Sequence, residues 1–209
     1  MRSPREWPIA DEEGFNSPYP PATIRFAPAT SGDLAARPPI TTVVFSPSGV
    51  FYDDTAFARW LVQLLNRMGV RTEFPSFRCL LQRDGLRSAY CGQSPYWTAL
   101  RGLLAEIGLN RGQLAEVEAA GFVRWQQCEE QVRLLPGVAS TLERLASNGL
   151  RLAVLTNSVV SAEQVKRRFE RLGLAGYFAA ILTSCDLGHV LPEPAAFQAL
   201  LDRINVAAP

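Results

Sequence analysis

The run Ile40-Thr-Thr-Val-Val-Phe45, followed by the turn sequence Ser46-Pro-Ser-Gly49, decides the fold of this 209-residue chain. The run is apolar and rich in β-branched residues, and Pro39 and the turn bound it, which is typical of a buried strand. Two further apolar runs of this kind occur at residues 150–156 and 178–183. We therefore predict three buried strands.

Helical segments separate these strands. Apolar residues recur at i, i+3 and i+4 spacing at residues 57–68, 97–107, about 113–132, 138–148 and 194–204. A capping box of Ser161 and Gln164 predicts the start of one more helix, and we expect a turn-rich segment from Phe74 to Gly92. Strands alternating with such helices predict an α/β fold with a parallel, Rossmann-like sheet, whose ligands bind at the carboxyl ends of the strands. Those ends are Ser46, Thr156 and Thr183.

The composition of the chain argues against several classes of function. With 21 basic and 20 acidic residues, a net charge of +1, the chain offers no clustered positive charge, so we expect neither nucleic acid nor a membrane as partner. It lacks the roughly 18 apolar residues of a spanning helix and the apolar segment of a secretory signal, so we expect a cytoplasmic protein. His189 and Lys166 are the only histidine and lysine, and the four cysteines have no metal-ligand spacing, so we expect no metal site of these residues.

Residues 1–39 form a separate, proline-rich arm. Residues 1–40 contain eight of the fifteen prolines and no sustained periodicity, a composition typical of a disordered tail or linker. An arm that docks through aromatic side chains is the alternative that the sequence leaves open. The candidate anchors are Trp7, Phe15, Tyr19 and Phe26.

Several segments resemble, in order, the motifs of the haloacid dehalogenase superfamily, most of whose members are phosphatases built on a Rossmann-like sheet. The segment from Val43 to Asp53 is similar to the first motif, a hydrophobic strand followed by D-x-D-G-T-L-x-D. The segment Leu155-Thr-Asn-Ser158 is similar to the second motif. The segment from Ser184 to Pro194 resembles the third, S-x-x-x-G-x-x-K-P-D-P.

This resemblance implies a domain organisation. Residues 40–54 and 134–209 correspond to the core, and the helical insert of residues 55–133 corresponds to the mobile cap. Aromatic residues at helical spacing in this insert, including Trp60, Trp97 and Trp125, are expected to pack in the core of the cap. The fourth motif, an acidic pair after a further strand, has no counterpart, so we expect an apparently truncated sheet whose first strand is covered by the arm, by a second subunit or by further polypeptide.

The residues at the catalytic positions of the family are not those that its chemistry requires. In the family the first aspartate attacks phosphorus, the second is the general acid and base, carboxylates hold Mg²⁺, and a lysine neutralises the phosphoryl group. The corresponding residues here are Ser46, Ser48 and Leu191. A hydroxyl is a poor nucleophile without a base and a weak Mg²⁺ ligand, and leucine carries no charge. We therefore expect no intact catalytic residue, no metal site and no cofactor, although the resemblance implies Mg²⁺.

Polar, uncharged groups remain at these strand ends. Thr156 and Asn157 match the phosphate-binding second motif, and the backbone N–H groups around Ser48 and Gly49 are candidates for binding an anion. A small anion or a phosphorylated ligand is therefore a candidate partner. The alternative is that these residues only satisfy local turns and strand ends.

A serine hydrolase arrangement would use Ser46 as nucleophile, His189 as base and Asp186 to orient the base. The chain lacks G-x-S-x-G, and Pro47 provides no N–H for an oxyanion hole, so we weigh against this arrangement. The leading interpretation is a haloacid-dehalogenase-like protein without hydrolase activity, a binding or regulatory module with a protein partner or a homodimer as candidate assemblies. The alternatives are a phosphatase-type hydrolase with rearranged catalytic residues, and a fragment of a longer hydrolase of this kind.

Overall fold

The computed structural model describes residues 40–81 and 85–206. The prediction of a proline-rich arm and of its covering role falls on residues 1–39, outside the described part. Within that part the chain forms a three-stranded parallel sheet in the order β1-β2-β3. The strands are β1 (Thr42–Phe45), β2 (Arg151–Thr156) and β3 (Phe178–Thr183). The predicted parallel α/β fold is confirmed, with β1 beginning two residues later than expected.

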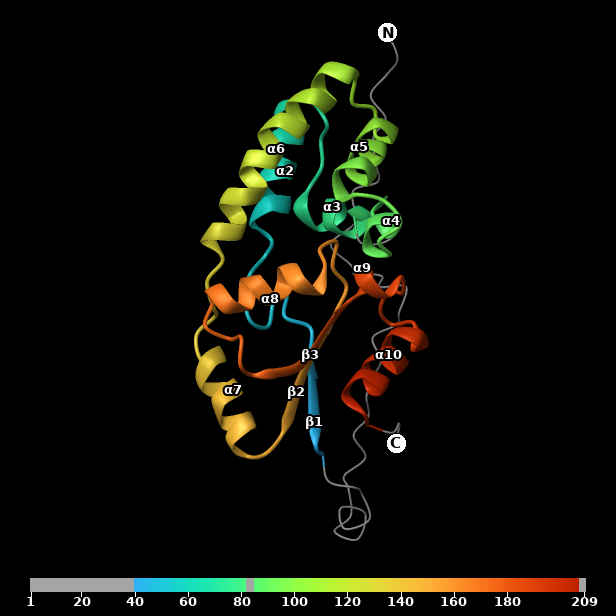
Figure 1. Cartoon of the computed structure of the whole chain (residues 1–209). Helices are drawn as coiled ribbons and strands as arrows, with labels where there is room; N and C mark the ends of the chain where they lie inside the picture. Colours follow the sequence, from blue (N-terminus) through green and yellow to red (C-terminus); the bar gives the residue numbers. More distant parts are fainter. Residues whose placement is uncertain (1–39, 82–84, 207–209) are drawn as a thin grey trace, which may run out of the picture. The chain divides into compact units, whose positions relative to one another are not determined.

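Helices pack on both faces of this sheet (Figure 1). The core helices are α7 (Val138–Ser147), α8 (Ala162–Arg171), α9 (Ser184–Leu187) and α10 (Pro194–Ile204). On one face Leu152 and Val154 of β2 pack in a cluster with Leu142 of α7 and Phe169 of α8. On the other face Leu155 packs in a cluster with Leu200 of α10. The sheet thus has an apolar layer on each side, which fixes the positions of its strand ends.

The insert between β1 and α7 is helical, and α2 and α6 lie side by side in it (Figure 1). Its helices are α2 (Ala56–Arg67), α3 (Phe74–Leu80), α4 (Arg87–Tyr90), α5 (Tyr96–Glu106) and α6 (Arg111–Gln131). They enclose their own apolar cluster, against which the predicted Trp60, Trp97 and Trp125 pack. We call this helical insert the cap and the rest of the described residues the core.

Two local expectations have different outcomes. The capping box at Ser161 is confirmed, because its Oγ accepts from the Gln164 N–H and the Gln164 side chain accepts from the Ser161 N–H. The segment from Phe74 to Gly92 was expected to be turn-rich, but it contains α3 and α4. Pro75 near the start of α3 is compatible with a helix because the first turn needs no donor there. No helix in the described ranges is long and apolar enough to cross a membrane.

Candidate functional site

The carboxyl ends of β1 and β2 lie next to each other because the two strands are parallel neighbours in register. Ser46 follows β1 and Thr156 ends β2, and their hydroxyl oxygens are 3.1 Å apart, within hydrogen-bond distance. Thr156 is buried and Ser46 is exposed. The structure thus brings together the residues of the first and second motifs, as the sequence predicted.

A tight turn after β1 brings a carboxylate to this edge. The Pro47 carbonyl accepts from the Val50 and Phe51 N–H groups, and Gly49 adopts a positive φ of 71° that suits glycine. The chain therefore folds back, and the Ser48 hydroxyl donates a hydrogen bond of 2.6 Å to Asp54 Oδ1. Asp54 Oδ2 has no hydrogen-bond partner among the described residues. Asp54 could not be identified from the sequence, because only the turn shows that this residue returns to Ser48.

The neighbouring Asp53 has a structural role at the start of the cap. Its Oδ1 accepts a hydrogen bond of 2.8 Å from the Thr55 N–H, at the start of α2. The hydrogen bonds from Thr55 lower the pKa of Asp53, and the positive charges of Arg59 and Arg78 contribute to the same shift. Asp53 therefore stays ionised and holds the first turn of the cap, while Asp54 faces the strand ends. These two arginines therefore lie close enough to act on Asp53.

Two of the predicted phosphate-binding groups are already engaged. The Gly49 N–H donates to the Tyr52 carbonyl at 2.9 Å, so in this conformation it is not available to an anion. The Asn157 side chain donates to the Leu191 carbonyl at 3.2 Å and accepts from the Leu191 N–H at 2.7 Å. Asn157 thus positions the third-motif loop. The third predicted group, the Thr156 hydroxyl, is buried and already has local partners, the Ser46 hydroxyl at 3.1 Å and the Asn157 carbonyl at 3.4 Å.

The members of the serine hydrolase arrangement have other hydrogen-bond partners in the structure. Asp186 Oδ2 accepts from the Thr183 hydroxyl at 3.0 Å and from the first N–H of α8, that of Ala162, at 2.6 Å. His189 Nδ1 lies 3.0 Å from Glu193 Oε2, and Arg87 of the cap donates to Glu193 Oε1 at 2.8 Å. Asp186 therefore caps a helix, and His189 belongs to a surface cluster between core and cap.

A cavity of about 350 Å³ lies beside the strand ends, between cap and core. Asp54 and Asn157 line it, whereas Ser46, Ser48 and Thr156 are not among its lining residues. Asp54 and Asn157 therefore connect the strand-end cluster to the cavity. A group held at the strand ends could extend past them into this space.

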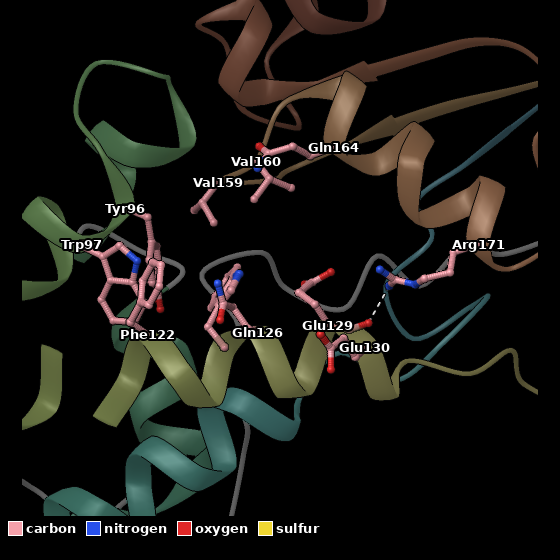
Figure 2. Close-up of a pocket in the computed structure, with 11 residues that line it drawn as sticks. Tyr96, Trp97, Phe122, Gln126, Glu129, Glu130, Val159, Val160, Gln164 and Arg171 are labelled. Carbon is pink, nitrogen blue, oxygen red and sulfur yellow. Dashed lines mark hydrogen bonds between the residues drawn. The ribbon is translucent and has the colours of Figure 1, made fainter. Parts of the chain in front are cut away.

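A second, more open cavity of about 620 Å³ adjoins the first and shares Tyr96, Trp125, Glu129, Val159 and Val160 with it. Figure 2 shows Val159 and Val160 of the core opposite the aromatic side chains of the cap, with Glu129, Glu130 and Arg171 at the other end. The two cavities together form one cleft between cap and core.

An ion pair that is largely removed from water joins core and cap at this cleft. Arg168 of α8 donates to both carboxylate oxygens of Glu129, which lies near the end of α6, at 2.9 and 2.5 Å. It also donates to the Tyr52 hydroxyl at 2.9 Å. Burial acts to lower the pKa of Arg168, but the charge of Glu129 and the hydrogen bonds to Glu129 and Tyr52 outweigh it and raise this pKa. Burial raises the pKa of Tyr52. The guanidinium is thus committed to holding the cap and is not open to a ligand.

The residues present do not fit the Mg²⁺ ion that the fold family implies. Mg²⁺ is held by carboxylates together with waters, whereas the first-motif positions carry the hydroxyls of Ser46 and Ser48. Ser46 is hydrogen-bonded to Thr156, and one oxygen of the nearby Asp54 is held by Ser48. Among residues 40–81 and 85–206, no three acidic, histidine or cysteine side chains are grouped as a metal site. Chemistry at these strand ends must therefore be derived from the side chains alone.

Comparisons with known proteins agree on one family. The model of a family described as "haloacid dehalogenase-like hydrolase" matches residues 49–209. The chain is 33% identical over 90 residues to a ribulose-1,5-bisphosphate 5-phosphatase of Halopiger xanaduensis, covering 43% of this chain and 37% of the relative. It is 34% identical over 80 residues to a phosphoglycolate phosphatase of Yersinia pseudotuberculosis, covering 38% and 34%. The matched segments span little more than a third of these curated relatives.

Solved structures of this family share the fold. An L-2-haloacid dehalogenase from Xanthobacter autotrophicus superposes with a TM-score of 0.55 at 20% identity, covering 82% of this chain and 67% of the other. A predicted phosphoglycolate phosphatase from Haemophilus somnus gives a TM-score of 0.54 at 18% identity, covering 80% and 72%. At this level of identity the likeness concerns the fold alone.

Proposed function

Because this chain belongs to the haloacid dehalogenase-like hydrolases, we propose that it is a phosphatase-type hydrolase that works with rearranged residues. The curated relatives are phosphatases, which favours this alternative over a non-catalytic module. The observation that carries the proposal is the hydrogen bond of 2.6 Å between Ser48 and Asp54. It places a carboxylate beside the position where the family has its general acid and base.

Asp54 is the general base in this proposal. Its Oδ1 is held by the Ser48 hydroxyl, and its Oδ2 is open to a water molecule. Asp54 takes a proton from that water while the water oxygen bonds to phosphorus and the bond from phosphorus to the leaving oxygen breaks. The leaving oxygen departs with the electron pair and takes the proton back from Asp54. The products are inorganic phosphate and an alcohol, and no covalent enzyme intermediate is needed.

Phosphate charge is balanced by arginine in this proposal. Leu191 stands where the family has lysine, and Arg168 is committed to Glu129. Arg59 and Arg78 of the cap act on Asp53 and are therefore near the acidic pair. Arg78 has no hydrogen-bond partner within the described part of the chain, so its guanidinium is open to phosphate oxygens.

The test is release of inorganic phosphate from p-nitrophenyl phosphate by the purified full chain. Ser46→Ala should change the rate by less than about threefold, because water and not Ser46 is the nucleophile. Arg78→Met should raise KM about tenfold, since charged hydrogen bonds to phosphate are lost. A matched control is Arg67→Met, an exposed arginine at the end of α2 that has no part in the site.

Two results would contradict the proposal. Absence of phosphate release above the rate of a buffer blank would favour the non-catalytic binding module that the sequence suggested. Complete loss of turnover in Ser46→Ala would show that Ser46 itself attacks phosphorus.

A further inference from the structure

The side chains that line the cavity of about 350 Å³ differ from the polar groups at the strand ends, because many of them are apolar. Its cap side combines aliphatic side chains with four aromatic ones, and its core side includes two valines. The aromatic residues are Phe57, Tyr90, Tyr96 and Trp125, and the valines are Val159 and Val160. Its volume is at the lower end of the range of small-molecule sites, which suits a group of one or two rings.

The aromatic residues form a packed set. The ring centroids of Trp125 and Phe57 are 5.0 Å apart with planes at 73°, and those of Trp125 and Tyr96 are 4.9 Å apart at 41°. Such contacts restrict ring rotation, so the surface is formed before a ligand binds. The loop that carries the two valines is also fixed, because the Ser158 N–H donates to the Ser184 hydroxyl at 3.0 Å.

The charges that line the cavity disfavour an anionic group. The acidic side chains there are Asp53, Asp54 and Glu129, and the basic one is Arg168, which is paired with Glu129. A second phosphate or a carboxylate would therefore meet acidic groups without an open cation. The cavity fits a neutral group.

Two phenol groups supply unused hydrogen-bond donors. Neither the Tyr90 nor the Tyr96 hydroxyl has a hydrogen-bond partner among the described residues, and both side chains are partly buried and line the cavity. Burial raises the pKa of both groups, so both remain protonated. A polar atom on an otherwise apolar ligand would pair with them.

We propose that this cavity binds the leaving group of the substrate and that this group is a neutral aromatic alcohol, so that the substrate class is the aryl phosphate monoesters. The role as leaving-group site rests on the proposed function, whereas the affinity for a neutral aromatic molecule does not. Asp54 and Asn157 connect the two parts of the site, so a phosphoryl group at the strand ends places its ester oxygen at the mouth of the cavity. The class differs from that of the curated relatives named for ribulose bisphosphate and phosphoglycolate.

Calorimetry with three probes tests this proposal: 1-naphthol, 1-naphthyl phosphate and 2-phosphoglycolate. We expect both naphthyl compounds to bind at least about tenfold more tightly than phosphoglycolate. Trp125→Leu should weaken 1-naphthol binding about tenfold and Tyr96→Phe about threefold, since they remove a ring face and a donor. The control Trp60→Leu alters a cap tryptophan that does not line the cavity and should leave the affinity unchanged.

The outcomes separate the two proposals. If 1-naphthol binds but 1-naphthyl phosphate is not hydrolysed, the aromatic cavity stands and the hydrolase proposal fails. If 1-naphthol does not bind, or binds equally well to Tyr96→Phe and Trp125→Leu, the cavity assignment is overturned even if phosphate is released. Phosphoglycolate binding as tight as that of 1-naphthyl phosphate would also overturn it. Tyr96→Phe removes one oxygen only, so it still tests the cavity if Trp125→Leu does not fold.

Discussion

Replacement of Arg168 by methionine should destabilise the protein by about 3 kcal/mol. The Arg168 side chain is 11% exposed and that of Glu129 is 30% exposed, so the pair is largely removed from water. Leaving one partner of a fully buried pair alone costs about 3–5 kcal/mol, which the partial exposure of Glu129 reduces to about 2 kcal/mol. The Tyr52 hydroxyl, on a side chain that is 1% exposed, also loses its partner, which adds about 1 kcal/mol.

Urea denaturation followed by tryptophan fluorescence measures this change. Arg167→Met is the matched control, because its pair with Glu163 has side chains that are 71% and 61% exposed. It should change the free energy of unfolding by less than about 0.5 kcal/mol. In a double-mutant cycle with Glu129→Gln, the effects of the two substitutions on the free energy of unfolding should be far from additive. Additive effects, or a loss in Arg168→Met no larger than in the control, would refute the argument that this pair holds the cap on the core.

Three further predictions concern the cap contact, pH and metal. Gly92→Ala should lower the free energy of unfolding, measured by thermal denaturation, by about 2 kcal/mol or more, because Gly92 has φ +67° and a Cβ there would lie 2.2 Å from the Cys185 carbonyl oxygen. The control Gly69→Ala, at φ +87° with nothing within 4 Å of the added Cβ, should lower it by about 1 kcal/mol. The hydrogen bond from Arg87 lowers the pKa of Glu193 from 4.5. The contribution of the Glu193 carboxylate to stability should therefore be present above pH 4.5 and be lost as the pH falls through the lowered pKa. Equal stability of Glu193→Gln and wild type at pH 7 would contradict this prediction. Calorimetry should detect no one-site Mg²⁺ binding at sub-millimolar affinity, and such binding would show that the carboxylates beside the strand ends suffice to hold the ion.

The sheet and its edge could be predicted from the sequence because they depend on local signals. Apolar runs bounded by proline and glycine predicted the strands, and parallel order then placed Ser46 beside Thr156. The role of Asp54 could not be predicted, since it depends on the turn at Pro47 that returns the chain to Ser48. Family motifs directed attention to the aspartates missing at residues 46 and 48, and not to a carboxylate six residues beyond Ser48.

The cavity shows a second limit of sequence patterns. The helical spacing of Trp125 predicted packing in the cap, and it does pack there. The same ring also lines the cavity, because it faces the same space as Val159 and Val160 of the core. Periodicity identifies the buried face of a helix but cannot show that another part of the chain stops short of it and leaves a space.

The most direct test of this account is the kcat/KM for p-nitrophenyl phosphate of Asp54→Asn relative to the wild type. We predict a loss of about 100-fold or more, because the amide cannot take the proton of the attacking water. Asp53→Asn should stay within about threefold, since an amide oxygen can still accept from the Thr55 N–H. Wild-type turnover in Asp54→Asn, or an equal loss in both variants, would contradict the claim that Asp54 provides the base.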